Sequence, residues 1–292
     1  MDIDTLSFTD TPRYSAIKSL LRALVANKKA LLGAVMLLLL VVIGVLAPVL
    51  APFDPNQTGV GPLLSKPTMA HLMGTDTYGR DTFSRLLFGA RISLLVAFSV
   101  AIGSTAIGVF AGLITGYVGG VADYLLMRLV DVLFAFPWVL MTLSVATILG
   151  PGLETVIISL IIVYSPALAR LARSSALSVR EMQYVEAARA VGLGDFSIIV
   201  KHILPNCASP IVIQCTAIMG YSILAEAGIS YLGLGTQPPT PSWGLSLSDG
   251  TDYMGIVPQL VVFPGLAIVY AVLSFNLLGD GLRDILDPRR RH

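Results

Sequence analysis

Long apolar stretches, each about as long as a bilayer is thick, alternate with short polar segments along this chain. A helix needs about 20 consecutive apolar residues to cross the hydrocarbon core of a membrane. The pattern therefore predicts an all-α polytopic membrane protein with six transmembrane helices. We place them at residues 30–50, 91–117, 124–149, 153–171, 207–234 and 258–278.

Composition supports this fold class and excludes several functions. The 292 residues are 55% hydrophobic and 13% charged, with a mean hydropathy of +0.79, which is too apolar for a soluble domain. The net charge of +1 comes without a basic stripe that could neutralise phosphates, so we expect no nucleic-acid partner. The three histidines, at positions 71, 202 and 292, are too far apart for metal-ligand spacing, and we predict no metal site.

The polar segments give the predicted domain organisation. Residues 1–29 form a cytoplasmic N-terminal segment in which residues 15–29 could lie as an amphipathic helix on membrane lipid. Residues 51–90 form an extracytoplasmic loop, residues 91–280 the transmembrane core, and residues 281–292 a cytoplasmic tail.

Charge predicts the orientation of the chain in the membrane. Of the 19 Lys and Arg residues, only Lys66, Arg80, Arg85 and Arg91 lie in segments predicted outside. Loops rich in Lys and Arg stay on the cytoplasmic side. We therefore expect both termini, and the polar segment at residues 184–206, to lie in the cytoplasm.

The segment at residues 184–206 has the pattern of a short helix, a turn and a second helix. Glu186, Ala187 and Ala188 favour a helix. Gly192 and Gly194 allow a sharp turn, and Asp195 could cap the second helix. Leu204-Pro205 would interrupt the helix where the fifth apolar stretch begins. Another protein could bind a segment of this shape at the membrane surface.

This segment resembles the EAA loop of ABC importer permeases, in which Glu-Ala-Ala is followed by a glycine and by an Ile-Leu-Pro motif. The resemblance implies a type I importer fold and a loop that docks on ATPase subunits. It assigns this coupling role to Glu186, Ala187, Ala188, Arg189, Gly192, Leu204 and Pro205. Partners implied are a second homologous permease subunit, two ATP-binding subunits and an extracytoplasmic solute-binding protein.

A second motif begins at residue 71 and reads HLMGTDTYGRDTFSR, followed by FGAR and ISL. It is similar to the permeases that import peptides, nickel and related solutes. Asp76, Arg80, Asp81, Arg85 and Arg91 can pair with one another. They could form a structural ion-pair network or contact the solute directly.

Two sets of charged residues are predicted inside the transmembrane core. Arg128 and Asp131 are three residues apart on one helical face and can pair near the membrane boundary. Glu226 is the acidic residue of the fifth apolar stretch, and such a residue must face protein, water or a cation. Glu226 is therefore our candidate for the solute pathway, with pairing to an Arg of this or a partner subunit as the alternative.

The sequence lacks the G-x-x-x-x-G-K-[ST] phosphate-binding motif and any convergent catalytic set. We expect no enzymatic activity and no cofactor in this chain, with ATP and magnesium bound by the partner ATPases. The resemblance implies a permease of the bacterial inner membrane that imports di- or oligopeptides. Nickel chelates, glutathione and small sugars are alternative solutes within the same architecture. An ion-coupled secondary transporter and a membrane anchor subunit of an enzyme complex are alternatives of other classes.

Overall fold

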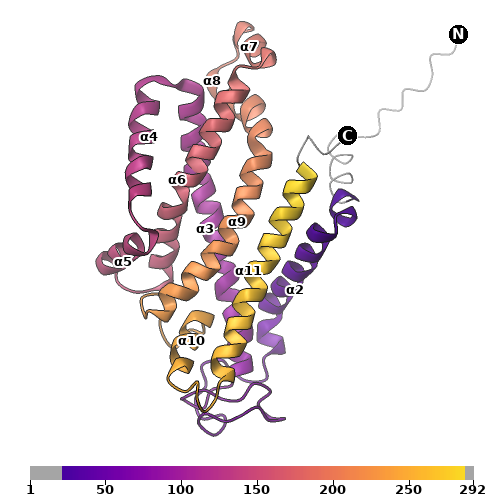
Figure 1. The fold of residues 1–292 in the computed structure, drawn as a ribbon, viewed down its shortest axis with the longest axis vertical. Coiled ribbons are helices and arrows are strands. Elements are labelled where there is room, and N and C mark those ends of the chain that lie inside the picture. Colours follow the sequence, from indigo (N-terminus) through magenta and orange to yellow (C-terminus); the bar gives the residue numbers. More distant parts are fainter. Residues whose placement is uncertain (1–21, 287–292) are drawn as a thin grey trace, which may run out of the picture.

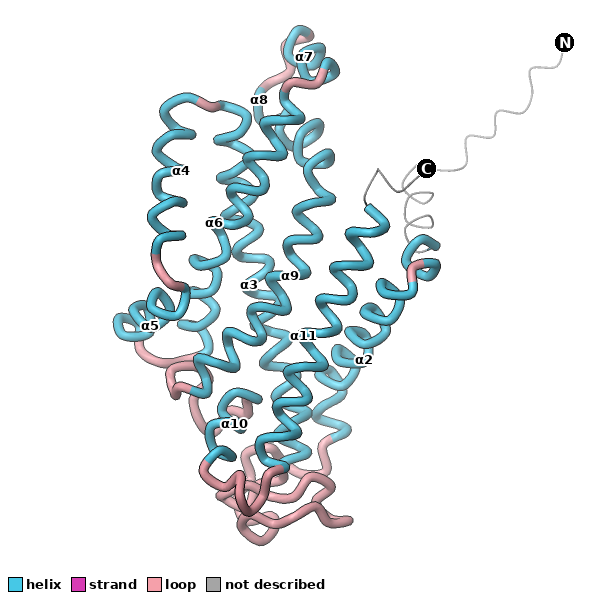
Figure 2. Tube along the Cα trace, viewed as in Figure 1, coloured by secondary structure: helices cyan, strands magenta, loops and turns pink. Residues whose placement is uncertain are grey.

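The computed structural model describes residues 22–286, and the regular elements in this part of the chain are helices (Figures 1 and 2). Five of them are long and apolar enough to cross a membrane. They are α2 (Lys28–Leu50), α3 (Thr82–Val118), α6 (Leu153–Arg180), the joined helix Asp195–Tyr231, which ends in α9 (Leu204–Tyr231), and α11 (Gln259–Leu286). The short helices α7 (Gln183–Ala190) and α10 (Trp243–Thr251) lie at opposite ends of the bundle.

The third predicted span is a pair of helices rather than one straight helix. α4 (Gly120–Ala135) and α5 (Trp138–Leu149) meet at a bend of 94°, so the pair counts as a sixth span only if it is taken as one broken crossing. The break follows from Pro137, because a proline disfavours helical dihedrals in the residue before it. Phe136 is accordingly extended, with φ −86° and ψ 130°.

The second span is longer than the sequence predicted. α3 begins at Thr82, inside the segment assigned to the extracytoplasmic loop, and it continues without a break to Val118. Asp81 starts the helix, because its carboxylate accepts a hydrogen bond from the backbone N–H of Ser84 at 2.8 Å. The ordered loop before α3 is therefore shorter than residues 51–90.

The centre of the bundle is the close packing of α3 against α6. Gly108, Gly112 and Gly116 lie one turn apart on α3, and each faces the backbone of α6 near Ser165, Ala169 or Arg173. Small residues on one face allow two helices in a membrane to approach closely. A core of buried apolar side chains from α3, α6 and α9 surrounds this contact.

α2 packs against α11 through small residues of both helices. Gly33 faces the backbone of Leu277 and Leu278, and Gly281 faces Ala30. Asn27 caps the start of α2, because its side chain accepts hydrogen bonds from the backbone N–H groups of Lys29 and Ala30. Of the amphipathic helix predicted for residues 15–29, residues 22–29 are described, and the rest lies outside the described residues.

The two ends of the bundle differ in character. α7, the start of α2 and the end of α11 lie toward one end, which we call the α7 end (Figure 1). The loop that precedes α3 and helix α10 lie at the other end, the α10 end.

Candidate functional site

Helix α7 presents one face to the bundle and the other to solvent. Val185 and Ala188, three residues apart, are buried in the α3–α6–α9 core. Glu186, Ala187 and Arg189, between and beside them, are exposed. This arrangement fixes α7 on the bundle and leaves the polar residues of the EAA loop (residues 184–206) accessible.

Gly192 makes the turn that ends α7. Its φ of +84° lies in the left-handed region that favours glycine. The backbone N–H of Leu193 donates to the carbonyl of Ala188 at 3.1 Å, which satisfies an otherwise unpaired carbonyl at the helix end. The sharp turn predicted from the sequence is present at this position.

Asp195 is the first residue of α8 (Asp195–Ile198) and not its cap, so the capping role predicted for it is wrong. Its carboxylate instead accepts a hydrogen bond from the hydroxyl of Tyr117 at 2.7 Å. Tyr117 lies in the last turn of α3, and the Arg189 guanidinium lies 5.4 Å from its ring centroid. The pKa of Arg189 is raised, chiefly by its contact with the Tyr117 hydroxyl. Sequence reasoning missed Tyr117, because its role depends on a contact across 78 residues.

Leu204-Pro205 does not interrupt the helix, contrary to the prediction. The helix runs from Asp195 to Tyr231, with a π-helical stretch at Ile199–Ile203 that ends two residues before Pro205. A proline cannot donate a backbone hydrogen bond, and the wider π turn accommodates the missing bond without ending the helix. The EAA loop is thereby joined rigidly to α9.

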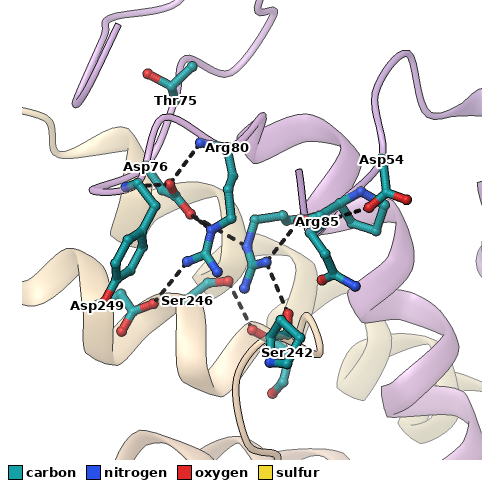
Figure 3. Close-up of polar contacts among 12 residues, drawn as sticks. Asp54, Thr75, Asp76, Arg80, Arg85, Ser242, Ser246 and Asp249 are labelled. Carbon is teal, nitrogen blue, oxygen red and sulfur yellow. Dashed lines mark hydrogen bonds and ion pairs between the residues drawn. The ribbon is translucent and has the colours of Figure 1, made fainter. Parts of the chain in front are cut away.

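A charged cluster at the α10 end joins the loop before α3 to α10 (Figure 3). Asp76 pairs with Arg80, whose Nε lies 2.6 Å from its carboxylate, and with Arg85 at 3.7 Å. Arg80 also reaches Asp249 of α10 at 3.8 Å, and Arg85 donates to the carbonyl of Pro55 at 2.9 Å. Burial raises the pKa of the Asp249 carboxyl, and the neighbouring Arg80 and Arg85 oppose that shift. Asp76, Arg80 and Arg85 are buried, so their arrangement supports a structural network.

The remaining members of the predicted network have other partners. Asp81 pairs with His71, whose Nδ1 lies 3.0 Å from its carboxylate, because Asp81 turns inward to cap α3. Arg91 lies one helical turn or more beyond the cluster, over the ring of Phe88 at 5.8 Å. Asp249 was missed by sequence reasoning, since it belongs to a helix far along the chain. Within residues 22–286, no group of His, Cys, Asp and Glu could hold a metal ion.

The predicted pair between Arg128 and Asp131 is wrong. Asp131 instead pairs with Arg170 of α6 at 2.7 Å. Eight residues earlier on α4, Asp123 accepts two hydrogen bonds from Arg173 of α6, at 2.5 and 2.6 Å. α4 and α6 run antiparallel in Figure 1, which brings the two carboxylates of one helix to the two guanidiniums of the other.

Glu226 is fully buried near the end of α9, away from the cavities that the bundle helices line and without a charged partner in the described chain. One of its carboxylate oxygens accepts hydrogen bonds from Ser230 at 2.7 Å, Ser242 at 2.9 Å and Thr236 at 3.1 Å. Ser242 also caps α10. Glu226 therefore holds the end of α9, the following loop and α10 together, and it has no Arg partner within residues 22–286. Its place in the solute pathway and a pairing to an Arg of a partner subunit stay predictions.

Comparison with known proteins places the chain in a family. Residues 108–292 match the family described as binding-protein-dependent transport system inner membrane component, and residues 15–67 match the N-terminal transmembrane domain of oligopeptide transport permease C. The fold resembles a permease chain of the inward-facing MetNI methionine ABC transporter. The TM-score is 0.55 at 20% sequence identity, over 70% of this chain and 97% of that one.

Curated relatives align over most of their length. A putative peptide transport permease of Brucella abortus is 44% identical over 92% of this chain and 90% of its own. A dipeptide transport permease of Alkalihalophilus pseudofirmus is 40% identical over 96% and 93%. A glutathione transport permease of Escherichia coli is 46% identical over 89% and 86%. The chain therefore belongs to the family of binding-protein-dependent transport system inner membrane components, the permease subunits of ABC importers.

Proposed function

We propose that this permease forms one half of the translocation pathway of a peptide importer and couples to ATPase subunits through the EAA loop. The relatives named for peptide, dipeptide and glutathione transport support this substrate class. Glutathione is itself a small peptide, so it is the second solute that we consider. No step of ATP chemistry is assigned to this chain; ATP and magnesium belong to the partner subunits.

The observation that carries the coupling role is an exposed apolar surface on the EAA loop. It comprises Tyr184, Val191, Leu193 and Phe196 of that loop together with Met182 just before it, and we call these residues the docking surface. Val191 and Phe196 are 83% and 73% exposed, and Figure 1 shows this part of the chain beyond the end of the long helices. Contiguous apolar groups outside the hydrocarbon belt mark a protein interface. Glu186 and Arg189 beside them provide the polar rim.

The charge distribution supports a cytoplasmic position for the docking surface. Lys and Arg residues concentrate in the second half of α6, in the EAA loop and at both ends of the chain, and the described parts of these lie toward the α7 end. The positive-inside rule assigns such an end to the cytoplasm. The α10 end then faces an extracytoplasmic solute-binding protein.

In the proposed mechanism a second, homologous permease covers the other side of the pathway, and two ATPase subunits hold the two EAA loops. Closure of the ATPases on ATP moves α7 and α8. Because α8 continues into α9 and Val185 and Ala188 are packed into the core, this movement is transmitted to α3, α6 and α9. Alternating access follows from the motion of these helices as a body.

The experiment is a purification of the tagged protein from mild detergent, with identification of the co-purified chains and an ATPase assay. Recovery of a second permease and P-loop ATPase chains with vanadate-sensitive hydrolysis supports the proposal. Phe196→Asp should abolish recovery of the ATPases, because it places a charge in the docking surface. Leu63→Asp, at a residue that is 66% exposed in the loop before α3, is the matched control and should leave recovery unchanged. A protein that purifies alone and moves solute with an ion gradient would overturn the proposal.

A further inference from the structure

Two cavities lie on either side of α9. The first, of about 460 Å³, is lined by α4, α5, α6 and α9 and contains Phe134, Trp138 and Tyr164; we call it the aromatic cavity. The second, of about 340 Å³, lies between α9 and α11 and contains Asn276, Asp280 and Arg283; we call it the polar cavity. Each is within the range of 300–1,000 Å³ that is typical of small-ligand sites.

The two cavities share Gln214 and Tyr221 of α9. These residues are seven positions apart, which is about two helical turns, so they lie on the same face. Gln214 and Tyr221 lie about 15 Å and about 26 Å along α9 from its start at Leu204, so the middle of this 28-residue helix lies between them. One face of α9 therefore borders both cavities at membrane depth.

Lipid cannot cover this face. Tyr221 is 52% exposed, and Asn276 and Asp280 of the spanning helix α11 are also exposed, as is Arg283 in the last turn of that helix. Polar and charged groups inside a membrane face water or protein, because hydrocarbon does not solvate them. Between Leu31 and Leu50, by contrast, the exposed large hydrophobic residues of α2 are Val and Leu, as expected of a surface against lipid.

We propose that Gln214 and Tyr221 form the solute-contacting wall of the translocation pathway, and that the two cavities suit a short zwitterionic peptide. Gln214 and Asn276 can pair with backbone amides of the solute. Aromatic rings of the first cavity can cover its side chains. Asp280 and Arg283, three residues apart on α11, offer one charge of each sign for an ammonium and a carboxylate. This inference rests on the proposed function and names the residues through which it acts.

The first test is cysteine accessibility in the complete complex, reconstituted in proteoliposomes. Cys207→Ala and Cys215→Ala remove the native thiols. Gln214→Cys and Tyr221→Cys should then react with a membrane-impermeant maleimide in the nucleotide-free complex, and Leu39→Cys, exposed on α2, should not. Equal protection of all three thiols would overturn the inference, because the α9 face would then be covered by lipid or protein.

The second test measures uptake of dialanine. Gln214→Ala should lower the initial rate by about threefold to tenfold, the loss expected for one hydrogen bond, with ATPase activity retained. Asp280→Asn and Arg283→Gln should each lower uptake, and Glu154→Gln, at an exposed position of α6, should not. Wild-type uptake in all of these variants contradicts the inference while leaving the ATPase partnership intact. Absence of any ATPase partner is a separate result that contradicts the proposed function.

Discussion

The hydroxyl of Tyr117 at the end of α3 donates a hydrogen bond to Asp195 at the start of α8, across 2.7 Å. Tyr117 is buried, and the neighbouring Gly116 carbonyl accepts a hydrogen bond from Arg180 of α6 at 2.9 Å. The EAA loop is thus tied by a side chain to α3, and the end of α3 is tied in turn to the end of α6.

Tyr117→Phe removes this hydrogen bond and keeps the ring in place. We expect the complex to assemble but to hydrolyse more ATP for each solute transported, because movement of α8 is then transmitted less directly to α3. The measurement is the ratio of ATP hydrolysed to solute imported in proteoliposomes. Asp195→Ala should give the same ratio, and the double variant should add nothing further. Tyr124→Phe, at an exposed tyrosine of α4, is the control. Additive effects of Tyr117→Phe and Asp195→Ala would show that the two residues act separately.

Gly192→Asp should also uncouple hydrolysis from transport. A residue with a side chain is strained at the φ of +84°, and nothing lies within 4 Å of an added Cβ. The effect is therefore expected on the direction of the turn and not on the packing of the bundle. Thermal stability close to that of the wild type, together with reduced transport, is the expected result. Gly194→Asp, at φ −66°, is the matched control. Wild-type transport in Gly192→Asp would contradict this assignment.

Gly112→Leu tests the contact between α3 and α6. A Cβ at Gly112 would overlap the carbonyl oxygen of Ala169, and backbone cannot move aside as a flexible side chain can. Overpacking in such a contact costs about 1–3 kcal/mol or more. We expect a clear loss of thermal stability in detergent. Gly265→Leu, in α11 with open space around it, should have little effect. Similar melting temperatures for both variants would mean that the helices separate more easily than the packing indicates.

The apolar pattern was sufficient to predict most of the spans. A helix that crosses lipid needs a long run of apolar residues, and such a run can be recognised in the sequence without knowledge of tertiary contacts. It could not locate helix ends within the polar residues. α3 extends back to Thr82 because Asp81 caps it, and α8 continues into α9 because a π turn absorbs Pro205. Pro137 is visible in the sequence, but the sequence pattern alone did not give the 94° angle between α4 and α5.

Charged residues show a second limit. The sequence brought Arg128 and Asp131 together because they are neighbours on one helix, yet Asp131 pairs with Arg170 and Asp123 with Arg173. The sequence does contain a signal for these pairs, since α4 carries the two carboxylates and α6 carries the two guanidiniums. Choosing the partners required knowing that α4 and α6 are adjacent. The turn at Gly192 could be predicted because it depends only on the dihedral angles of neighbouring residues. The long-range ion pairs could not, because they depend on which helices pack together.

Substitutions of Glu226 can distinguish a structural role from a role in transport. Its buried carboxylate accepts hydrogen bonds from Ser230, Thr236 and Ser242 through one oxygen, Oε1. Glu226→Gln keeps an acceptor at that position, because the amide oxygen can occupy it, and should leave both stability and dialanine uptake near wild type. Glu226→Ala leaves buried hydroxyls without an acceptor, at about 1–3 kcal/mol for each polar group left unsatisfied. We expect that variant to lose thermal stability, and to lose transport only in proportion to the folded protein that remains.

The comparison between these two variants decides the role of Glu226. A residue that binds a cationic group of the solute would lose transport in Glu226→Gln, where the charge is gone but the shape remains. A residue that only holds α9, the following loop and α10 together would lose nothing in that variant. The measurements are the melting temperature of each purified variant and its uptake rate for each folded complex. Loss of uptake in a fully stable Glu226→Gln protein would return Glu226 to the pathway and remove it from the structural role that its buried contacts indicate.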